Sequence, residues 1–203
     1  MQRIMSKKRA MTIIDNFSRS GVLVVGDIMA DHFIWGRVSR ISPEAPVPVV
    51  EVNKDDFLLG GCANVLNNIC AMGGRAYVAG VVGSDATGAK LLSEFCSRGV
   101  DTEGIAVERG RPTTLKTRIV AHGQQVVRFD QEDRRPVQAR SVRKILSYVR
   151  TIRDDLGALV VSDYSKGVVI RSLLDGIRRE LAGLPIFTCV DPKQRDFTLY
   201  EGF

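Results

Sequence analysis

The sequence of 203 residues has few aromatic side chains and no long apolar run, and both absences exclude classes of protein. Aromatic residues make up only 6% of the chain, which is too few for a platform on which nucleic-acid bases stack. No apolar stretch approaches the roughly 20 residues that a transmembrane helix needs, so we expect no membrane contact. The segment Met1–Arg9 lacks the apolar core of a secretory signal. We therefore expect a cytoplasmic protein.

Patterns typical of metal sites and disulfide frameworks are also missing. The chain has two histidines and four cysteines, and no CxxC pair occurs. Such spacing predicts neither a zinc site nor a disulfide framework, and it leaves any metal ligand unknown. We interpret the cysteines as small buried apolar residues. They are Cys62, Cys70, Cys96 and Cys189.

Two nucleotide-binding motifs are absent as well. The chain contains no GxxxxGK[ST] loop, which excludes a P-loop, and no GxGxxG follows the first predicted strand, which disfavours a dinucleotide-binding domain. The net charge of +6 and the pI of 9.3 raise the question of a nucleic-acid partner. Because the basic residues are mostly interleaved with acids, we expect no nucleic acid. A small anionic substrate would also use this excess of positive charge.

What the sequence does contain is an alternation of strand and helix patterns. The run Val22–Val25 is apolar at every position, which indicates a strand buried on both faces of a parallel sheet. The alternation that follows predicts an α/β fold with a mostly parallel sheet in three layers. Further strands are predicted at 75–82, 105–107, 158–162 and 186–190, and helices at 10–18, 60–72, 85–97, 137–156 and 170–181.

Two β-rich segments interrupt this alternation. Residues His32–Phe57 contain the only tryptophan and three of the seven prolines, which suits edge strands and turns. Residues Thr113–Asp130 have a hairpin pattern around a turn at His122–Gly123. We expect the two segments to pair into a small second sheet. It would act as a lid over the carboxyl ends of the main strands, where ligands of open α/β sheets bind.

Two motifs lie at element ends on this predicted ligand side. Asp27 and Asp31 follow the first strand, and a carboxylate there can accept hydrogen bonds from two adjacent hydroxyls of a sugar. The alternative is that Asp27 caps a turn and Asp31 is merely solvated. The pair Gly60–Gly61 opens a helix that carries Asn64, so the backbone N–H groups can approach a ligand closely. A tight turn explains the two glycines equally well.

The lid hairpin carries a third cluster. Lys116 and Arg118 alternate on one strand, and Arg128 and Asp130 alternate on the other, so each pair faces one side. Such a basic face would neutralise a phosphate group on a substrate. The alternative is an edge strand that its charges protect from aggregation, and the residues alone leave both interpretations open.

Taken in order, these segments resemble the ribokinase family of PfkB-type carbohydrate kinases. The resemblance covers the chain from about Ala10 to Phe203, and it implies a ribokinase-like three-layer sandwich with a β lid. Within the family, the similarity is greatest to kinases that phosphorylate D-glycero-D-manno-heptose 7-phosphate at C1. The strings that carry the resemblance are VLVVGDIMADHFIWGRVSRISPEAPVPVV, GGCANVLNN, TLKTRIVAHGQQVVRFDQED, VVSDYSKGV and VDPKQRDF.

The resemblance also implies site residues, cofactors and partners. It implies ATP with Mg²⁺, a phosphosugar substrate and a homodimer formed through the lid. Asp31 resembles the aspartate that holds sugar hydroxyls, and the glycine motif and the lid add further contacts to the phosphosugar. These further contacts are Gly60, Gly61, Asn64, Lys116, Arg118, Arg128 and Asp130. Residues that resemble nucleotide-side segments of the family are Asp163, Lys166, Asp191 and Lys193.

One departure from the family pattern is large. The GAGD-type segment that supplies the catalytic aspartate does not occur in these residues, so we predict no catalytic residue within the chain. We expect residues 1–203 to be the N-terminal, sugar-binding portion of a kinase domain that is truncated at its C-terminus. The alternatives are a non-catalytic module for sugar-phosphate binding or dimerisation, and a kinase of another sugar.

Overall fold

The computed structural model describes residues 5–203 and contains two sheets. The main sheet has the strand order β5-β4-β1-β8-β9, and its neighbouring strands are parallel. Parallel neighbours need crossover connections, which helices supply here. The main strands are β1 (Gly21–Gly26), β4 (Arg75–Gly83), β5 (Ile105–Glu108), β8 (Leu156–Ser162) and β9 (Phe187–Asp191).

Helices cover both faces of the main sheet and complete three layers. They are α2 (Cys62–Ala71), α3 (Ala86–Ser97), α4 (Ala139–Ile152) and α5 (Arg171–Glu180). In β1, Leu23 and Val25 join the core formed with α4 and α5, whereas Val24 joins the core formed with α2 and α3. Successive strand residues point to opposite faces, so a strand covered on both sides is apolar at every position. The predicted fold class is confirmed.

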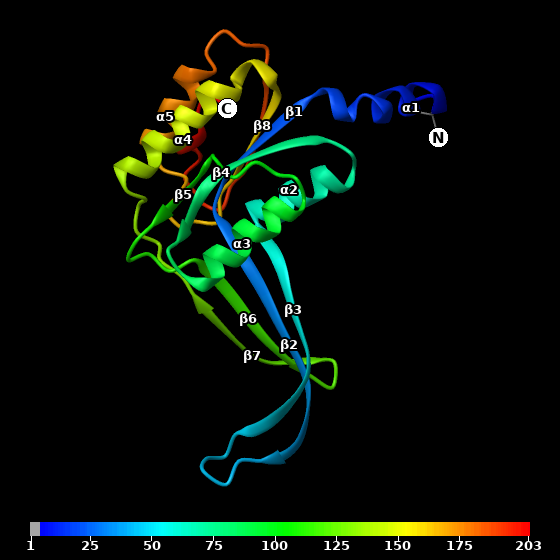
Figure 1. Ribbon diagram of the computed structural model, residues 1–203, viewed down its shortest axis with the longest axis vertical. Coiled ribbons are helices and arrows are strands. Elements are labelled where there is room, and N and C mark those ends of the chain that lie inside the picture. Colours follow the sequence, from blue (N-terminus) through cyan, green and yellow to red (C-terminus); the bar gives the residue numbers. More distant parts are fainter. Residues whose placement is uncertain (1–4) are drawn as a thin grey trace.

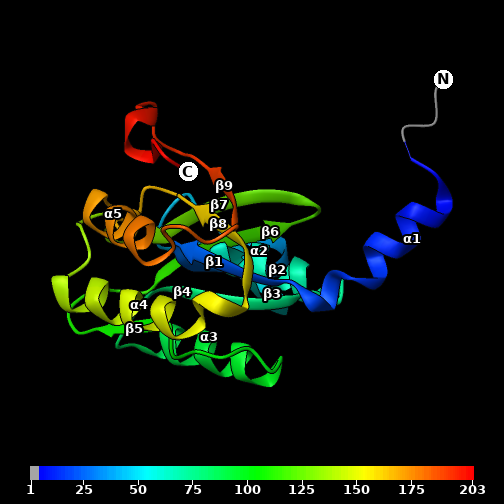
Figure 2. The same cartoon turned by 90° about the horizontal axis from the view of Figure 1, so that it is seen from above.

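The N-terminal helix α1 (Lys7–Asp15) lies outside these layers and extends from the body (Figure 2). Short 3-10 turns occupy residues 17–19, 153–155 and 197–200. Within residues 5–203, no helix is both long enough and apolar enough to cross a membrane.

The second sheet, which we call the lid sheet, has the strand order β3-β2-β6-β7 and extends away from the main body (Figure 1). Its strands are β2 (Ile28–Ile41), β3 (Pro48–Gly61), β6 (Thr114–Ala121) and β7 (Gln124–Gln131). β2 pairs antiparallel with β3 and parallel with β6, so the two β-rich segments do join into one sheet. β2 begins directly after β1, with one residue between them, and β3 leads directly into α2. The lid sheet is therefore tied to the main body at both ends of its long hairpin.

Three expectations need correction. Within the segment 32–57, β3 is an edge strand as expected and begins at Pro48, but β2 is an inner strand that pairs with β3 and β6. Pro43 and Pro46 lie in the turn between β2 and β3 and do not interrupt the pairing. The helix expected at 137–156 ends at Ile152, since the strand β8 already begins at Leu156.

The third correction concerns the cysteines, which are not all buried. Cys62 is buried and Cys70 is half-buried, but Cys96 and Cys189 are exposed. In α3 the buried face runs through Leu91 and Phe95, one turn apart, and Cys96 lies beside this face.

Candidate functional site

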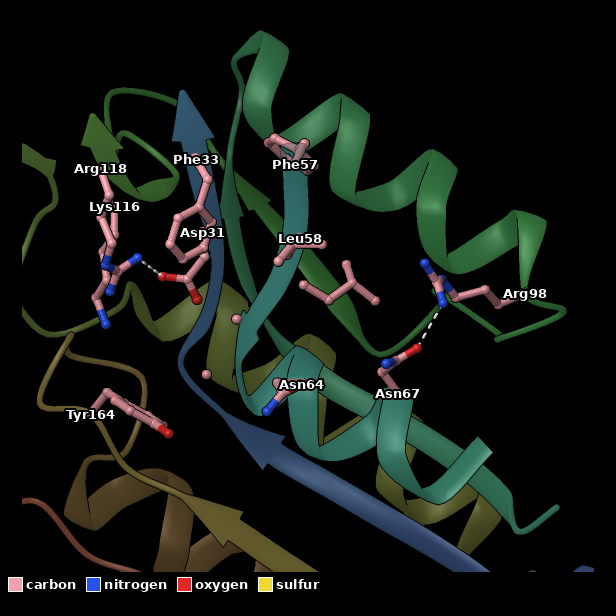
Figure 3. Close-up of a pocket in the computed structure, with 13 residues that line it drawn as sticks. Asp31, Phe33, Phe57, Leu58, Asn64, Asn67, Arg98, Lys116, Arg118 and Tyr164 are labelled. Atoms are coloured by element: carbon pink, nitrogen blue, oxygen red, sulfur yellow. Dashed lines mark hydrogen bonds and ion pairs between the residues drawn. The ribbon is translucent and has the colours of Figure 1, made fainter. Parts of the chain in front are cut away.

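A pocket of about 650 Å³ lies where the lid sheet meets the main body. Its wall comes from the lid strands β2, β3 and β6, from α2, from Arg98 at the end of α3 and from the loop after β8 (Figure 3). β1 and β8 point their carboxyl ends toward this region, which is where ligands of open α/β sheets bind. The pocket thus lies where the sequence predicted a ligand site.

Asp31 of β2 is held in this pocket by an ion pair. Strand pairing places Asp31 beside Lys116 of β6 and Phe33 beside Arg118, so these four side chains share one face of the lid sheet. The Arg118 guanidinium donates to Asp31 Oδ1 at 2.5 Å, and the two side chains are only 21% and 24% exposed. Such a bond fixes the carboxylate and leaves Oδ2 available to a ligand. Asp31 is therefore ordered by the fold rather than merely solvated.

Gly60 and Gly61 form the corner between β3 and α2, next to Asp31. A Cβ at Gly60 would lie 2.3 Å from Asp31 Oδ2, so a side chain there would displace the carboxylate. Gly61 has a φ of +55°, and a Cβ there would lie 2.6 Å from the carbonyl oxygen of Asp27. Both positions need glycine because the backbone packs so closely. α2 begins at the next residue, so its positive end and Asn64 are at the pocket.

Lys116 is the lid cation in the pocket that has no acidic partner among the described residues. Its Nζ lies 5.2 Å from the centre of the Tyr164 ring. Burial lowers the pKa of Lys116, Asp31 opposes that shift, and the neighbouring cations Lys166 and Arg128 add to it. A bound phosphate group would stabilise the charged ammonium and reverse these effects. The pocket is therefore electrostatically suited to an anion.

Arg128 and Asp130 of β7 continue the same rows across the lid sheet. Arg128 lies beside Arg118, and Asp130 lies beside Lys116. Arg128 donates two hydrogen bonds to Asp130, at 2.8 and 2.6 Å, which raises the pKa of Arg128 and lowers that of Asp130. Neither residue lines the pocket. The opposite charges of Arg128 and Asp130 offset each other. A direct contact of this pair with a phosphosugar stays a prediction.

Comparison with known proteins identifies the family. The sequence pattern described as "pfkB family carbohydrate kinase" matches residues 19–153, which is more than half of the chain. The chain belongs to this family. The bifunctional protein HldE of Desulfatibacillum aliphaticivorans is 43% identical over 188 residues, which are 92% of this chain and 38% of that protein. The bifunctional protein HldE of Geobacter metallireducens is 40% identical over 98% of this chain and 40% of that protein. The chain thus spans about two fifths of the length of these relatives.

Solved structures show the same fold at low sequence identity. Phosphofructokinase-2 from Escherichia coli, in complex with fructose-6-phosphate, matches with a TM-score of 0.64 and 21% identity over 90% of this chain and 57% of that chain. Arabidopsis thaliana ribokinase, complexed with ribose and ATP, matches with a TM-score of 0.58 and 15% identity over 87% of this chain and 54% of that chain. The fold of this pfkB-family chain is therefore ribokinase-like.

The residues that the family resemblance places near the nucleotide lie at the ends of β8 and β9. The N–H of Asp163 donates to the carbonyl of Asp191 at 3.0 Å, so these two strand ends are together. The Asp163 carboxylate is buried and accepts hydrogen bonds from the Ser165 amide at 2.6 Å and from the Tyr200 hydroxyl. The side chains of Asp191 and Lys193 are exposed. Contact of any of these residues with a nucleotide stays a prediction.

Lys166, the fourth of these residues, turns toward the lid. Its ammonium forms an ion pair with Glu132, just after β7, and the two side chains are 12% and 16% exposed. This bond lowers the pKa of Glu132. The ion pair thus joins the loop after β8, which contains Lys166, to the root of the lid hairpin. Contact of Lys166 with a nucleotide stays a prediction.

The described residues do not form a metal centre of their own. Within residues 5–203, no group of three or more His, Cys, Asp or Glu side chains gathers to hold a metal ion. Mg²⁺ in kinases is held largely by nucleotide phosphates and water, with only one or two protein carboxylates. We therefore assign Mg²⁺ no ligand in this part of the chain.

Sequence reasoning missed the three aromatic residues of the pocket, which are Phe33, Phe57 and Tyr164. Phe33 lies two residues after Asp31, so the period of two in a strand could have placed it on the same face. Tyr164 comes from the loop after β8, whose path depends on contacts with residues far away in the sequence. No local signal marks such a residue.

Proposed function

We propose that this chain is the sugar-binding portion of a kinase that transfers phosphate from ATP to C1 of D-glycero-D-manno-heptose 7-phosphate. Membership of the pfkB family supports a carbohydrate as the acceptor. The RISPEAPVPV, DYSKGV and DPK strings, which resemble those of heptose 7-phosphate kinases, support the particular sugar. The observation that carries the proposal is a pocket in which the Asp31 carboxylate, which can accept hydrogen bonds from sugar hydroxyls, lies beside Lys116, a cation without an acidic partner among the described residues.

Each part of the pocket has a task in this proposal. Asp31, oriented by Arg118, accepts hydrogen bonds from sugar hydroxyls. Gly60 and Gly61 let the sugar approach the backbone without a steric clash. Lys116 binds the phosphate group that the sugar already carries, which has a charge of about −1.5 to −2 at pH 7. Binding positions the C1 hydroxyl, whose oxygen forms a bond to the γ-phosphorus of ATP while the bond from that phosphorus to ADP breaks and the hydroxyl proton passes to a general base.

We assign no general base within residues 5–203, because Asp31 is bound to Arg118 and Asp163 is buried against Tyr200. This chain alone should bind the phosphosugar weakly and release no ADP. A coupled ADP-release assay on the 203-residue chain and on a version extended to the length of the relatives tests this assignment. Rapid ADP release by the 203-residue chain would show that a base lies within it and would overturn the assignment.

Calorimetric titration tests the pocket directly. Heptose 7-phosphate should bind more tightly than unphosphorylated heptose, and Lys116→Met should remove most of that difference. Asp31→Asn should weaken both sugars, because both use its carboxylate. Lys8→Met, which removes the same charge from the exposed helix α1, should change neither affinity. Equal binding of both sugars by the unaltered chain would contradict the proposed phosphate contact.

The single tryptophan gives a second measure of binding. Trp35 stacks on Phe33 with ring centroids 5.8 Å apart, and Phe33 lines the pocket. A sugar that enters the pocket should therefore change the fluorescence of Trp35. The change should saturate at the same concentration as the calorimetric signal.

A homodimer through the lid is the proposed assembly. The face of the lid sheet opposite Asp31 carries the cross-strand row Ile34, Ile119 and Val127, with Phe129 beside it. Phe129 is 54% exposed and Val127 is 44% exposed, and such an apolar patch favours contact with a second copy. Analytical ultracentrifugation should give a dimer that Phe129→Asp dissociates. A monomer at all concentrations would refute the assembly.

A further inference from the structure

Two buried side chains, one acidic and one basic, hold the loop after β8. On one side, the Asp27 carboxylate accepts three backbone N–H bonds, from Tyr164 at 2.8 Å, Lys166 at 3.1 Å and Val168 at 3.1 Å. Asp27 is only 1% exposed, so these amides replace the water that the carboxylate has lost. Asp27 lies between β1 and β2, at the point where the chain passes from the main sheet to the lid sheet. The loop is thereby fixed to the main body.

On the other side, Arg111 donates to backbone carbonyl groups. Its guanidinium bonds the carbonyl oxygens of Asp133 at 3.0 Å and Lys166 at 3.3 Å, and also that of Arg135. Nε of Arg111 donates to Glu108 at 2.9 Å, and the two side chains are 9% and 2% exposed. A guanidinium has five N–H donors in a fixed fork, which is why one side chain can bond four groups.

Glu108 fixes the position of the Arg111 guanidinium. Burial raises the pKa of Glu108, but bonds from the Ser141 hydroxyl at 2.6 Å, the Gln138 amide at 2.7 Å and Arg111 outweigh burial and hold the pKa below its usual value. The carboxylate is therefore charged at neutral pH and fully bonded. Glu108 is the last residue of β5, and its partners Gln138 and Ser141 lie at the start of α4, so Arg111 is anchored to the main body of the protein.

Arg111 and the carbonyl groups that it bonds belong to three segments, two of which continue into the sugar pocket at Lys116 and Tyr164. Arg111, Asp133 and Arg135 themselves line a separate cavity of about 360 Å³. Arg111 itself lies just before β6, and the carbonyl groups of residues 133 and 135 lie just after β7, so both roots of the lid hairpin are involved. The third segment is the loop that carries Tyr164 into the pocket. Above this junction, Lys116 of β6 lies over the Tyr164 ring, which is the contact between lid and loop inside the pocket.

We propose that Arg111 is a positioning residue for the sugar pocket: it sets the distance between the lid hairpin and the loop after β8, and so places Lys116 opposite Tyr164. The inference rests on the proposed function, because it assigns a task to a residue outside the pocket. The competing explanation is a buried ion pair with Glu108 that serves stability alone. The two explanations differ in which bonds of Arg111 matter, the single bond to Glu108 or the three bonds to carbonyl groups.

The substitution Arg111→Lys separates these explanations. Lysine keeps the positive charge for Glu108 but presents its donors from one point, so it cannot reach three carbonyl groups in different directions. We expect the thermal midpoint of Arg111→Lys to stay near that of the unaltered chain, while affinity for heptose 7-phosphate falls about tenfold. Arg111→Met should lose both stability and affinity, because it leaves Glu108 buried without a cation.

Hydrogen exchange supplies a readout that needs no sugar. In Arg111→Lys, the amides of residues 164–168 and of both lid roots should exchange faster, while those of β1 and β8 stay unchanged. Arg150→Lys is the matched control, since Arg150 forms a two-bond fork with Glu180 between α4 and α5, away from the pocket. It should alter neither exchange in these segments nor affinity.

The outcomes distinguish failure of this inference from failure of the proposed function. If the unaltered chain binds no heptose 7-phosphate, the proposed function fails, and the positioning role fails with it if exchange in Arg111→Lys is normal. If Arg111→Lys binds the sugar as tightly as the unaltered chain, Arg111 serves stability alone and the inference is overturned. Tenfold weaker binding at an unchanged thermal midpoint, with faster exchange confined to the loop and lid roots, supports it.

Discussion

A single residue, Asp27, separates β1 of the main sheet from β2 of the lid sheet, yet the strands of the two sheets differ in where their charged residues lie. Charged side chains in the main strands are confined to strand ends, at Arg75, Glu108 and Asp191. The interior of those strands is apolar or small, and β1 is buried almost throughout. In the lid sheet, by contrast, charged residues occur along the strands, and all eight residues of β7 are exposed.

This difference separates stability from binding. The main sheet buries apolar side chains on both faces, and burial of that kind is the largest favourable contribution to folding. The lid sheet buries little, but its polar face presents Asp31, Lys116 and Arg118 to the pocket. Substitutions in the two sheets should therefore affect different measurements, unfolding in one case and ligand affinity in the other.

The largest effect should come from the centre of the main sheet. Leu159 of β8 is completely buried, so Leu159→Ala should lower the free energy of unfolding by ~2–5 kcal/mol. Val127→Ala on β7, where the side chain is 44% exposed, should cost less than about 0.5 kcal/mol. Urea denaturation followed by circular dichroism measures both. Equal costs at the two positions would show that the lid sheet contributes to the core as much as the main sheet does.

The main sheet and the lid sheet also differ in how much of their structure could be predicted from the sequence. The main strands were predictable because a strand buried on both faces is apolar throughout, as Val22–Val25 shows. The pairing of the two β-rich segments was also predicted, but the inner position of β2 was not. The prolines suggested an edge strand, although Pro43 and Pro46 mark only the turn.

The candidate site was predictable where its residues follow local periodicity. Lys116 and Arg118 lie on one face because they are two apart in a strand, and the structure adds Asp31 to that face through strand pairing. Two contacts were not predictable because their residues are far apart in the sequence. Lys166 and Glu132 are 34 residues apart, and Arg111 is 55 residues from Lys166, whose carbonyl group it bonds. Such contacts depend on how the two sheets meet, which no local pattern records.

A smaller effect, on binding rather than folding, should follow from Gly60→Ala. The added methyl group would lie 2.3 Å from Asp31 Oδ2, so the carboxylate must turn away and lose its bond to Arg118. Affinity for heptose 7-phosphate should fall about tenfold, as expected for loss of a charge-assisted hydrogen bond. Calorimetry on the folded protein measures this fall.

The matched control for Gly60→Ala is Gly73→Ala, after α2. Gly73 has a φ of +78° and no atom within 4 Å of its added Cβ, so alanine there is strained but touches nothing. It should lower stability by about 1 kcal/mol and leave affinity unchanged. If both substitutions weaken binding equally, the contact between Gly60 and Asp31 has no special role in the pocket.

The smallest effect concerns the pH dependence of binding through Lys116. Burial lowers the pKa of the free Lys116 from 10.5, with Lys166 and Arg128 adding to the shift and Asp31 and Asp130 opposing it. A bound phosphate group favours the protonated ammonium and raises that pKa again. As pH rises through the lowered pKa of the free protein, affinity for heptose 7-phosphate should therefore fall, by no more than tenfold per pH unit.

Calorimetry between pH 7 and 10 tests this prediction, since the second ionisation of the phosphate group, near pH ~6, is then complete. Lys116→Arg keeps a cation that does not titrate in this range, so its affinity should stay level while that of the unaltered chain declines. Unphosphorylated heptose should show no such decline in either protein. A parallel decline in both proteins would mean that another group titrates, and the lid would then bind the phosphate through residues other than Lys116.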